Sequence, residues 1–234
     1  MADLQTTFER VEKKYLLEAG QYLELRARLR DEGMKRDAYG EHTISNVYFD
    51  TEDYELIRRS LDKPIYKEKL RLRAYGRDVS DDSEAFVEIK KKYRGIVYKR
   101  RIVLPLREAG RALALRRMPE SAGQIGREID RFLLYWQPRP KVMIAYDREA
   151  FFSERDPSVR VTFDRFIRYR TEDLDLAQGS AGTLLLPKDT YLMELKLPMV
   201  MPLWLVHTLE ACGVRPCSFS KYGQIYTKDI APGM

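Results

Sequence analysis

The sequence has few of the residues that build zinc centres and covalent active sites. Among 234 residues there are two cysteines, Cys212 and Cys217, and two histidines, His42 and His207. Two cysteines with no histidine nearby do not make a zinc site, and neither histidine stands near a serine–aspartate or cysteine arrangement typical of a triad. A histidine-rich metal centre and a Ser-His-Asp hydrolase are therefore disfavoured, and the few cysteines fit a reducing compartment.

Long apolar runs are missing too. No segment approaches the roughly 18 apolar residues that a membrane-spanning helix needs. The first residues, Met1–Gln5, lack a basic stretch followed by an apolar one, so no secretory signal is visible. There is also no low-complexity tract and no tandem repeat. We therefore expect a single domain over residues 1–234, without a transmembrane segment of its own and in the cytoplasm.

Charged residues, in contrast, make up 33% of the chain. Lys and Arg number 42 against 36 Asp and Glu, which gives a net charge of +6. The hydrophobic share of 44% is enough for a sizeable core. A mild basic excess indicates anionic partners only if the cations share one surface, so their placement along the chain decides the matter.

Apolar and polar residues alternate in several segments, a pattern typical of strands. We predict strands over Phe8–Leu17, His42–Asp50, Ile65–Tyr75, Glu84–Tyr93, Ile96–Leu104, Lys141–Phe152, Ser158–Asp164 and Tyr191–Leu197. Helical spacing predicts helices over Glu18–Asp31, Thr51–Leu61 with Thr51 as the N-cap, Arg107–Met118, Ala122–Gln137 and Pro202–Cys212. The expected fold class is α+β, mainly antiparallel β, with about eight strands and helices between some of them.

One face of the predicted strands collects cations. They are Arg10, Lys14, Lys67, Lys69, Arg71, Arg73, Lys90, Lys92, Lys99, Arg101, Arg148, Arg160 and Lys196. The acids on the same faces are Glu12, Glu88, Asp164 and Glu194. A single strand with one polar face usually faces water, but water-facing sheets mix their charges because like charges opposite each other are destabilising.

The whole set of strands therefore favours a closed channel. A sheet this long tends to curl or close, and an eight-stranded β-barrel with its helices packed outside would turn the cations inward. Facing cations need compensating anions, and a chain of phosphates suits them because arginine binds phosphate bidentately and lysine binds it as a point charge. Few aromatic side chains, Tyr146 mainly, share the cationic face, so nucleic acid is not the expected partner.

The carboxylates on this face suggest a metal. Glu194 and Glu12 could hold Mg²⁺ or Mn²⁺, which binds one or two carboxylates together with phosphate oxygens. The alternative is that each acid pairs with neighbouring lysines or arginines.

Eight short motifs in order carry a family resemblance. They are RVEKKYLL (Arg10–Leu17), SNVYFDT (Ser45–Thr51), KEKLRLRAYG (Lys67–Gly76), FVEIKKKYRGIVYKRR (Phe86–Arg101), YDREAF (Tyr146–Phe151), VRVTFD (Val159–Asp164), LMELK (Leu192–Lys196) and FSKY (Phe219–Tyr222). Together they resemble the VTC domain, the polyphosphate polymerase domain of the vacuolar transporter chaperone family. That family belongs to the triphosphate tunnel metalloenzymes, with the CYTH phosphatases. The resemblance covers about residues 8–225.

The resemblance implies an eight-stranded tunnel that moves the terminal phosphate of ATP onto polyphosphate with Mn²⁺ or Mg²⁺. The catalytic residues that it implies are Lys69, Arg71, Arg73, Lys90, Arg148 and Lys221. Substrate-binding roles fall on Arg10, Lys14, Lys67, Lys92, Lys99, Arg101, Tyr146, Arg160, Lys196 and Ser220. The implied metal ligands are Glu194 and Glu12. Expected partners are ATP, inorganic polyphosphate, and tripolyphosphate or pyrophosphate. A separately encoded membrane-protein partner stays open.

One departure from the superfamily pattern bears on the reaction. Tunnel phosphatases carry ExExK in the first strand, whereas this chain has Arg10-x-Glu12-x-Lys14. One carboxylate fewer disfavours a two-metal hydrolase and favours the polymerase. Two alternatives remain: a triphosphatase that uses water as the acceptor, and a polyphosphate-binding subunit without turnover.

Overall fold

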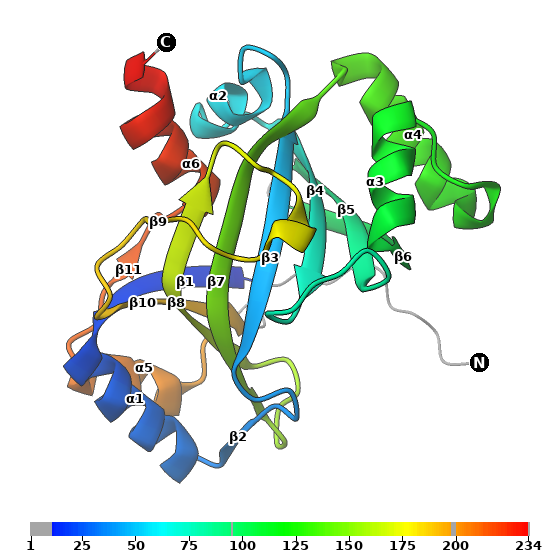
Figure 1. Cartoon of the computed structure of the whole chain (residues 1–234). Coiled ribbons are helices and arrows are strands. Elements are labelled where there is room, and N and C mark those ends of the chain that lie inside the picture. Colours follow the sequence, from blue (N-terminus) through cyan, green and yellow to red (C-terminus); the bar gives the residue numbers. More distant parts are fainter. Residues whose placement is uncertain (1–10, 95, 198–199, 234) are drawn as a thin grey trace. The chain divides into compact units, whose positions relative to one another are not determined.

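The computed structural model of the chain describes residues 11–94, 96–197 and 200–233 (Figure 1). They fall into two compact units. The first consists of the described residues of Met1–His42, Tyr146–Ile167 and Leu184–Ser220. The second consists of those of Thr43–Ala145, Arg168–Thr183 and Lys221–Met234. Two long strands, β7 (Arg139–Ser153) and β8 (Arg160–Arg170), contribute residues to both units.

In the first unit, strands pair in the order β11-β1-β10-β8-β7, and β2 also pairs with β7. The strands not yet given are β1 (Val11–Glu18), β2 (Met34–Arg36), β10 (Thr190–Leu197) and β11 (Pro216–Cys217). Two helices, α1 (Ala19–Asp31) and α5 (Leu203–Ala211), lie side by side (Figure 1). Leu25 and Leu29 of α1 and Leu205 of α5 share one core with Tyr15 and Met193 of the strands. The apolar strand face is therefore covered by helices, as the alternation predicts.

In the second unit, strands pair in the order β7-β3-β4-β5-β6, and the pairings from β3 to β6 are antiparallel. Their bounds are β3 (His42–Asp50), β4 (Tyr66–Tyr75), β5 (Glu84–Tyr93) and β6 (Ile96–Pro105). Helices α3 (Leu106–Leu115) and α4 (Gly123–Trp136) lie against β5 and β6 (Figure 1). Leu70 and Val87 of the strands share a core with Leu113 and Phe132 of these helices. The opposite strand face is left to the charged residues.

The remaining elements are short. They are α2 (Glu55–Leu61), α6 (Lys221–Ile225), β9 (Thr183–Leu184), the 3₁₀ turns η1 (Glu120–Ala122), η2 (Leu176–Gln178) and η4 (Ala231–Gly233), and the π turn η3 (Tyr226–Ile230). β9 pairs with β8.

The predicted fold class, α+β with a mainly antiparallel sheet, is confirmed. Eleven strands are present among the described residues. The eight predicted segments are all strands there, and the additional β2, β9 and β11 are too short to show alternation. The strand pairings of the described residues follow an open path from β11 to β6, so they do not establish a closed barrel.

The single domain over residues 1–234 stays a prediction. In the part of the chain that the structure describes, no helix combines the length and apolar content that crossing a membrane requires.

The predicted start of α2 was wrong. The helix begins at Glu55, because Tyr54 before it lies in the left-handed region at φ 61° and cannot belong to a right-handed helix. Thr51 Oγ1 still accepts a hydrogen bond from the Glu55 amide at 2.7 Å. The main cap is Asp50, a fully buried carboxylate that accepts from the amides of Leu56 and Ile57 at 2.9 and 3.0 Å.

The same carboxylate holds the C-terminal helix. Asp50 accepts a further hydrogen bond, at 2.9 Å, from the hydroxyl of Tyr222 in α6. Burial raises the pKa of Asp50, and the donated hydrogen bonds oppose that rise. One side chain thus joins α2 and α6, two helices that pack against each other within the second unit (Figure 1).

We predict that Asp50→Ala destabilises the protein by about 3 kcal/mol, because it leaves buried amide donors of α2 without acceptors. Tyr222→Phe, which removes only the hydroxyl, should cost about 1 kcal/mol. Thermal or urea unfolding measures both changes. The matched control is Asp53→Ala, whose carboxylate is 59% exposed. If Asp50→Ala unfolds like this control, Asp50 does not anchor the two helices.

Candidate functional site

The charged face of β4, β5 and β6 places like charges directly opposite one another. The strand register puts Lys69, Lys90 and Lys99 in one row across the three strands. In a second row, Lys67 of β4 lies opposite Lys92 of β5. Opposed like charges destabilise a sheet, so these rows are costly in the absence of an anion.

A single buried carboxylate lies in the next row. Glu88 of β5 is opposite Arg71 of β4 and Arg101 of β6, and it is 1% exposed. Arg71 Nε donates to Glu88 Oε2 at 2.6 Å, Lys99 Nζ lies 2.7 Å from Oε1, and Arg73 Nε lies 3.7 Å from Oε2. Burial alone would raise the pKa of Glu88, but these cations outweigh burial and lower it to about 2. The carboxylate therefore stays ionised.

Strand β3 orients the two arginines with neutral groups. Arg71 Nη1 donates to the Tyr48 hydroxyl at 3.1 Å, and Arg73 Nε donates to Asn46 Oδ1 at 2.8 Å. Asn46 is fully buried and is itself fixed by donating to the Ile144 carbonyl at 3.1 Å. Each guanidinium is thus held on one side by the protein.

Two titrating groups in this set have shifted pKa values. Burial raises the pKa of Tyr48, but Arg71, Arg73 and Lys221 outweigh burial and lower it to about 8. Burial lowers the pKa of Lys99, and although Glu88 opposes this, the neighbouring arginines add to it, so the value is about 8. Both groups can therefore change charge in the physiological range.

The second unit thus brings together nine predicted site residues. They are Lys67, Lys69, Arg71, Arg73, Lys90, Lys92, Lys99 and Arg101 on the strands and Lys221 as the first residue of α6. We call them the cationic cluster. The pKa of Lys67 is lowered by burial and by the neighbouring Lys92 and Lys90, which shows how closely the charges are packed.

The first unit has a different set, built around Arg148 of β7. Its Nε and Nη2 donate to both oxygens of Asp164 of β8, at 2.5 and 2.8 Å, in a bidentate pair. Asp164 is fully buried, and the centre of the Arg148 guanidinium lies 5.1 Å from the ring centroid of buried Tyr146. This pairing fixes the guanidinium plane.

The metal ligands predicted from the sequence lie near this arginine. Glu194 of β10 is 9% exposed, with Lys14 Nζ 3.5 Å from Oε1 and Arg148 Nη2 3.4 Å from Oε2. Lys14 Nζ also lies 3.6 Å from Glu12 Oε1 and donates to the Phe219 carbonyl at 2.9 Å.

The register extends this set across β8. Lys196 lies between Glu12 and Arg160, and Glu194 lies between Lys14 and Thr162. Burial lowers the pKa of Lys196, and the neighbouring Arg148 adds to the effect. We call Glu12, Lys14, Tyr146, Arg148, Arg160, Asp164, Glu194 and Lys196 the mixed cluster.

The mixed cluster fits a divalent cation that takes most of its ligands from phosphate and water. The contacts of Glu194 with Lys14 and Arg148, at 3.5 and 3.4 Å, are longer than the Arg148–Asp164 bonds. Thr162 Oγ1, opposite Glu194 in register, is buried and makes no hydrogen bond within the described residues. In the same part of the chain, no group of three or more His, Cys, Asp and Glu residues is placed to hold a metal. Mg²⁺ commonly binds through one or two carboxylates plus phosphate oxygens and water, which suits this small donor set.

Two predicted residues are not assigned to either cluster. Arg10 lies outside the described residues. Ser220 immediately precedes α6 at the end of the first unit.

Five contributing residues were not predicted as site residues: Asn46, Tyr48, Glu88, Thr162 and Asp164. A signal for them was present. The alternation that places Val47 and Phe49 on the apolar face of β3 places Asn46 and Tyr48 on the charged face. Thr162 and Asp164 likewise share a parity with Arg160.

The family model of the VTC domain matches residues 9–228. This chain belongs to the VTC domain family. The match covers both clusters and confirms the resemblance drawn from the eight motifs. Among curated proteins, none matches the sequence.

Two solved structures share the fold of this VTC domain. A protein from Bacillus halodurans that is provisionally named as an adenylate cyclase has 15% identity and a TM-score of 0.58, with 92% of this chain and 96% of that chain covered. A protein of the same provisional name from Vibrio parahaemolyticus has 11% identity and a TM-score of 0.52, with 94% and 99% covered. Identities this low establish a common fold and nothing about the reaction.

We predict that Glu88→Gln lowers the stability of this VTC domain by about 3 kcal/mol, because three cations lose their buried counter-charge. Tripolyphosphate should then raise the melting temperature more in the variant than in the wild type. Glu24→Gln, at an exposed ion pair, is the control. Equal melting temperatures for Glu88→Gln and wild type would mean that the carboxylate does not hold the cluster together.

The lowered pKa of Glu88 adds a pH test of the same contact. A carboxylate whose pKa falls on folding stabilises the folded state above its ordinary pKa of 4.5, and this contribution is lost as the pH falls toward 2. The wild-type stability should therefore drop over this range more steeply than that of Glu88→Gln.

We also predict that tripolyphosphate binding by the protein weakens above pH 8. Tyr48 gains a negative charge and Lys99 loses its positive charge as the pH rises through about 8. Each change should weaken binding by up to roughly tenfold. Because bound phosphate raises both pKa values, the decline should begin at or above pH 8. Titration calorimetry from pH 7 to 9.5 measures it, and Tyr48→Phe, which sees the same ligand ionisation, should decline less. Parallel curves for wild type and Tyr48→Phe would exclude Tyr48 as a titrating contact.

Proposed function

We propose that this VTC domain is a polyphosphate polymerase that transfers the terminal phosphate of ATP to a growing polyphosphate chain. The observation that carries the proposal is the cationic cluster, in which rows of opposed lysines are balanced by one carboxylate, Glu88. Family membership supports it independently. A bound phosphate chain would supply the missing negative charge along several successive rows.

The two clusters suit different parts of such a reaction. The cationic cluster has the charge to hold several linked phosphates, with Arg71 and Arg73 already oriented by β3. The mixed cluster carries three carboxylates, Glu12, Asp164 and Glu194, beside its cations. We assign the donor triphosphate and its metal to the mixed cluster, and the chain to the cationic cluster, which includes Lys221. The closed eight-stranded tunnel, with Arg10 among its residues, belongs to this proposal.

In this proposal Glu194 is the main ligand of the metal, and Glu12 supplies a second carboxylate. When bound, Mn²⁺ or Mg²⁺ would neutralise charge on the donor phosphates. Arg148, with its plane fixed by Asp164, would present its remaining edge to the same phosphates. The same donor phosphates would also be bound by Tyr146, Arg160, Lys196 and Ser220.

The transfer needs no nucleophile from the protein. A terminal oxygen of the acceptor phosphate attacks the γ-phosphorus of ATP, the bond from that phosphorus to the β–γ bridging oxygen breaks, and ADP leaves with the electron pair. The protein aligns the two reactants and offsets the charge that spreads over the transferring group. Held arginines do this well because they need little reorganisation during the step.

Two alternatives use the same residues. A triphosphatase would accept water in place of the chain, and a binding subunit would hold polyphosphate without turnover. The Arg10-x-Glu12-x-Lys14 sequence at the position of ExExK favours the polymerase over a two-metal hydrolase. A cytoplasmic location and a membrane-protein partner remain part of the proposal.

Product analysis after incubation with ATP and Mn²⁺ or Mg²⁺ tests the proposal. Long chains with equivalent ADP are expected, and orthophosphate without chains would make the protein a hydrolase. Chain binding without turnover under either metal would make it a binding subunit. Arg73→Ala should reduce synthesis at least tenfold through the loss of a charge-assisted contact, while Arg111→Ala on α3 should not.

In the same assay we predict that Glu194→Gln binds tripolyphosphate at least as tightly as wild type but loses most of its turnover. The variant keeps the side-chain size and removes the negative charge that a hard divalent cation favours. Turnover near wild type at limiting Mn²⁺, with reduced stability, would instead make Glu194 a salt-bridge partner only.

A further inference from the structure

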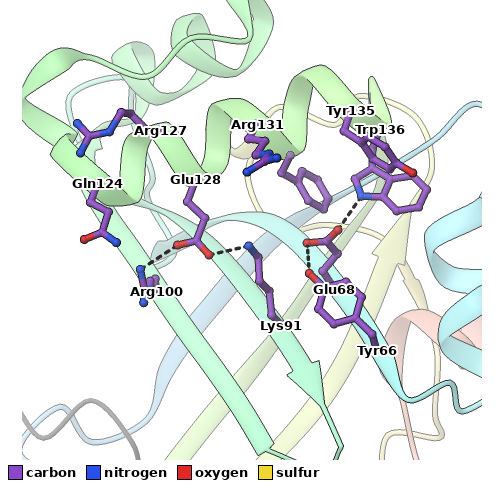
Figure 2. Close-up of a pocket in the computed structure, with 11 residues that line it drawn as sticks. Tyr66, Glu68, Lys91, Arg100, Gln124, Arg127, Glu128, Arg131, Tyr135 and Trp136 are labelled. Carbon is purple, nitrogen blue, oxygen red and sulfur yellow. Dashed lines mark hydrogen bonds and ion pairs between the residues drawn. The ribbon is translucent and has the colours of Figure 1, made fainter.

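The second unit has a pocket that the proposed function does not use. It has a volume of about 680 Å³ and lies between α4 and the strand face opposite the cationic cluster (Figure 2). Its floor comes from Tyr66 and Glu68 of β4, Lys91 of β5 and Arg100 of β6. These positions alternate with the cationic ones, so they lie on the other side of the strands. The volume is within the range of pockets that bind small molecules.

One side of the pocket is electrostatically balanced. Glu128 of α4 accepts hydrogen bonds from Lys91 Nζ at 2.6 Å and from Arg100 Nη1 at 3.0 Å. In Figure 2 these three side chains meet below α4. They need no further counter-charge.

The helix side of the pocket is not balanced. Arg127 and Arg131 are four residues apart on α4 and both line the pocket. Among the described residues, neither has a hydrogen-bond or ion-pair partner. Like charges at this spacing repel and destabilise a helix. Exposed arginines are commonly only solvated, but here the unpaired charges border a hollow, which gives an anion a place to bind.

The other end of the pocket is aromatic. Trp136 Nε1 and the Tyr66 hydroxyl donate to Glu68 at 2.8 and 2.9 Å, and Tyr135 lies beside Trp136 with ring centroids 4.8 Å apart. Figure 2 shows Arg131 between this group and Glu128. Aromatic faces suit a planar ring, and an ionised carboxylate accepts hydrogen bonds only, so Glu68 favours a ring that carries a donor such as an amino group.

We propose that this pocket binds a nucleoside monophosphate whose base carries an amino group. The phosphate, with a charge near −2, would match Arg127 and Arg131, and the base would lie at the aromatic end with its amino group toward Glu68. The lining has four cationic side chains and two carboxylates, so two positive charges are in excess. A triphosphate would exceed this charge, which separates the pocket from the site for ATP.

Tryptophan fluorescence tests the proposal, because the chain has two tryptophans and one of them, Trp136, lines the pocket. In a Trp204→Phe protein, AMP should change the remaining fluorescence saturably. Adding Arg127→Ala and Arg131→Ala should weaken AMP binding at least about tenfold, while adding Arg111→Ala on α3 should leave it unchanged. IMP, which has an oxo group in place of the amino group, should bind more weakly than AMP.

Each alternative result would overturn a stated part of the proposal. Equal binding of AMP and IMP would remove the role of Glu68. A response to tripolyphosphate but not to AMP would make the pocket a phosphate site, and no saturable response to AMP would exclude a ligand of this class. The melting temperature of the double arginine variant, with and without AMP, shows that it is folded and gives a second readout. Polyphosphate synthesis without AMP should be unchanged in this variant, so failure here is distinct from failure of the proposed function.

Discussion

The contact between Glu88 and its surrounding cations is the constraint on which the charged face of the second unit depends. Sheet pairing forces Lys69, Lys90 and Lys99 into one row, and no rearrangement of side chains can remove a charge that the register has placed there. One ionised carboxylate in the adjacent row offsets part of the repulsion. The remaining excess charge is what the face offers to an anion. Stability and binding are therefore opposed in the same few residues, and a ligand relieves a strain that folding creates.

The two clusters orient their arginine side chains in different ways. Arg71 and Arg73 are oriented partly by the neutral side chains of Tyr48 and Asn46, and they share the single carboxylate of Glu88 with Lys99. Arg148 is paired bidentately with Asp164, which fixes its plane but neutralises it. In the proposed reaction, the first arrangement suits attraction of a charged chain, and the second suits exact placement of one guanidinium beside the metal.

Much of the fold could be predicted from the alternation of residues, because period two reports directly which strand face meets the core. The long strands β4 and β5 and the helix α4 were predicted to within a few residues for this reason. The additional strands β2, β9 and β11 could not be predicted, since two or three residues show no period. The start of α2 was misplaced because the left-handed Tyr54 leaves no signature in the local pattern.

The cationic residues of the site were predicted because charged side chains are visible in a sequence, whereas their neutral partners Asn46 and Tyr48 were missed because neutral groups give no such signal. Asn46 and Tyr48 have the right parity, but an amide and a phenol on a strand have many ordinary explanations. That Asn46 meets Arg73 depends on the β3–β4 register, which the sequence of either strand alone does not determine.

The hydrogen bond between Asp50 and Tyr222 joins residues 172 positions apart and sets the place of α6, whose first residue is Lys221. During synthesis, Lys221 is made after every other member of the cationic cluster. The hydrogen bond from the Tyr222 hydroxyl to Asp50 can therefore form only after most of the chain has been synthesised. A nascent chain therefore carries the crowded strand face before the helix that completes it.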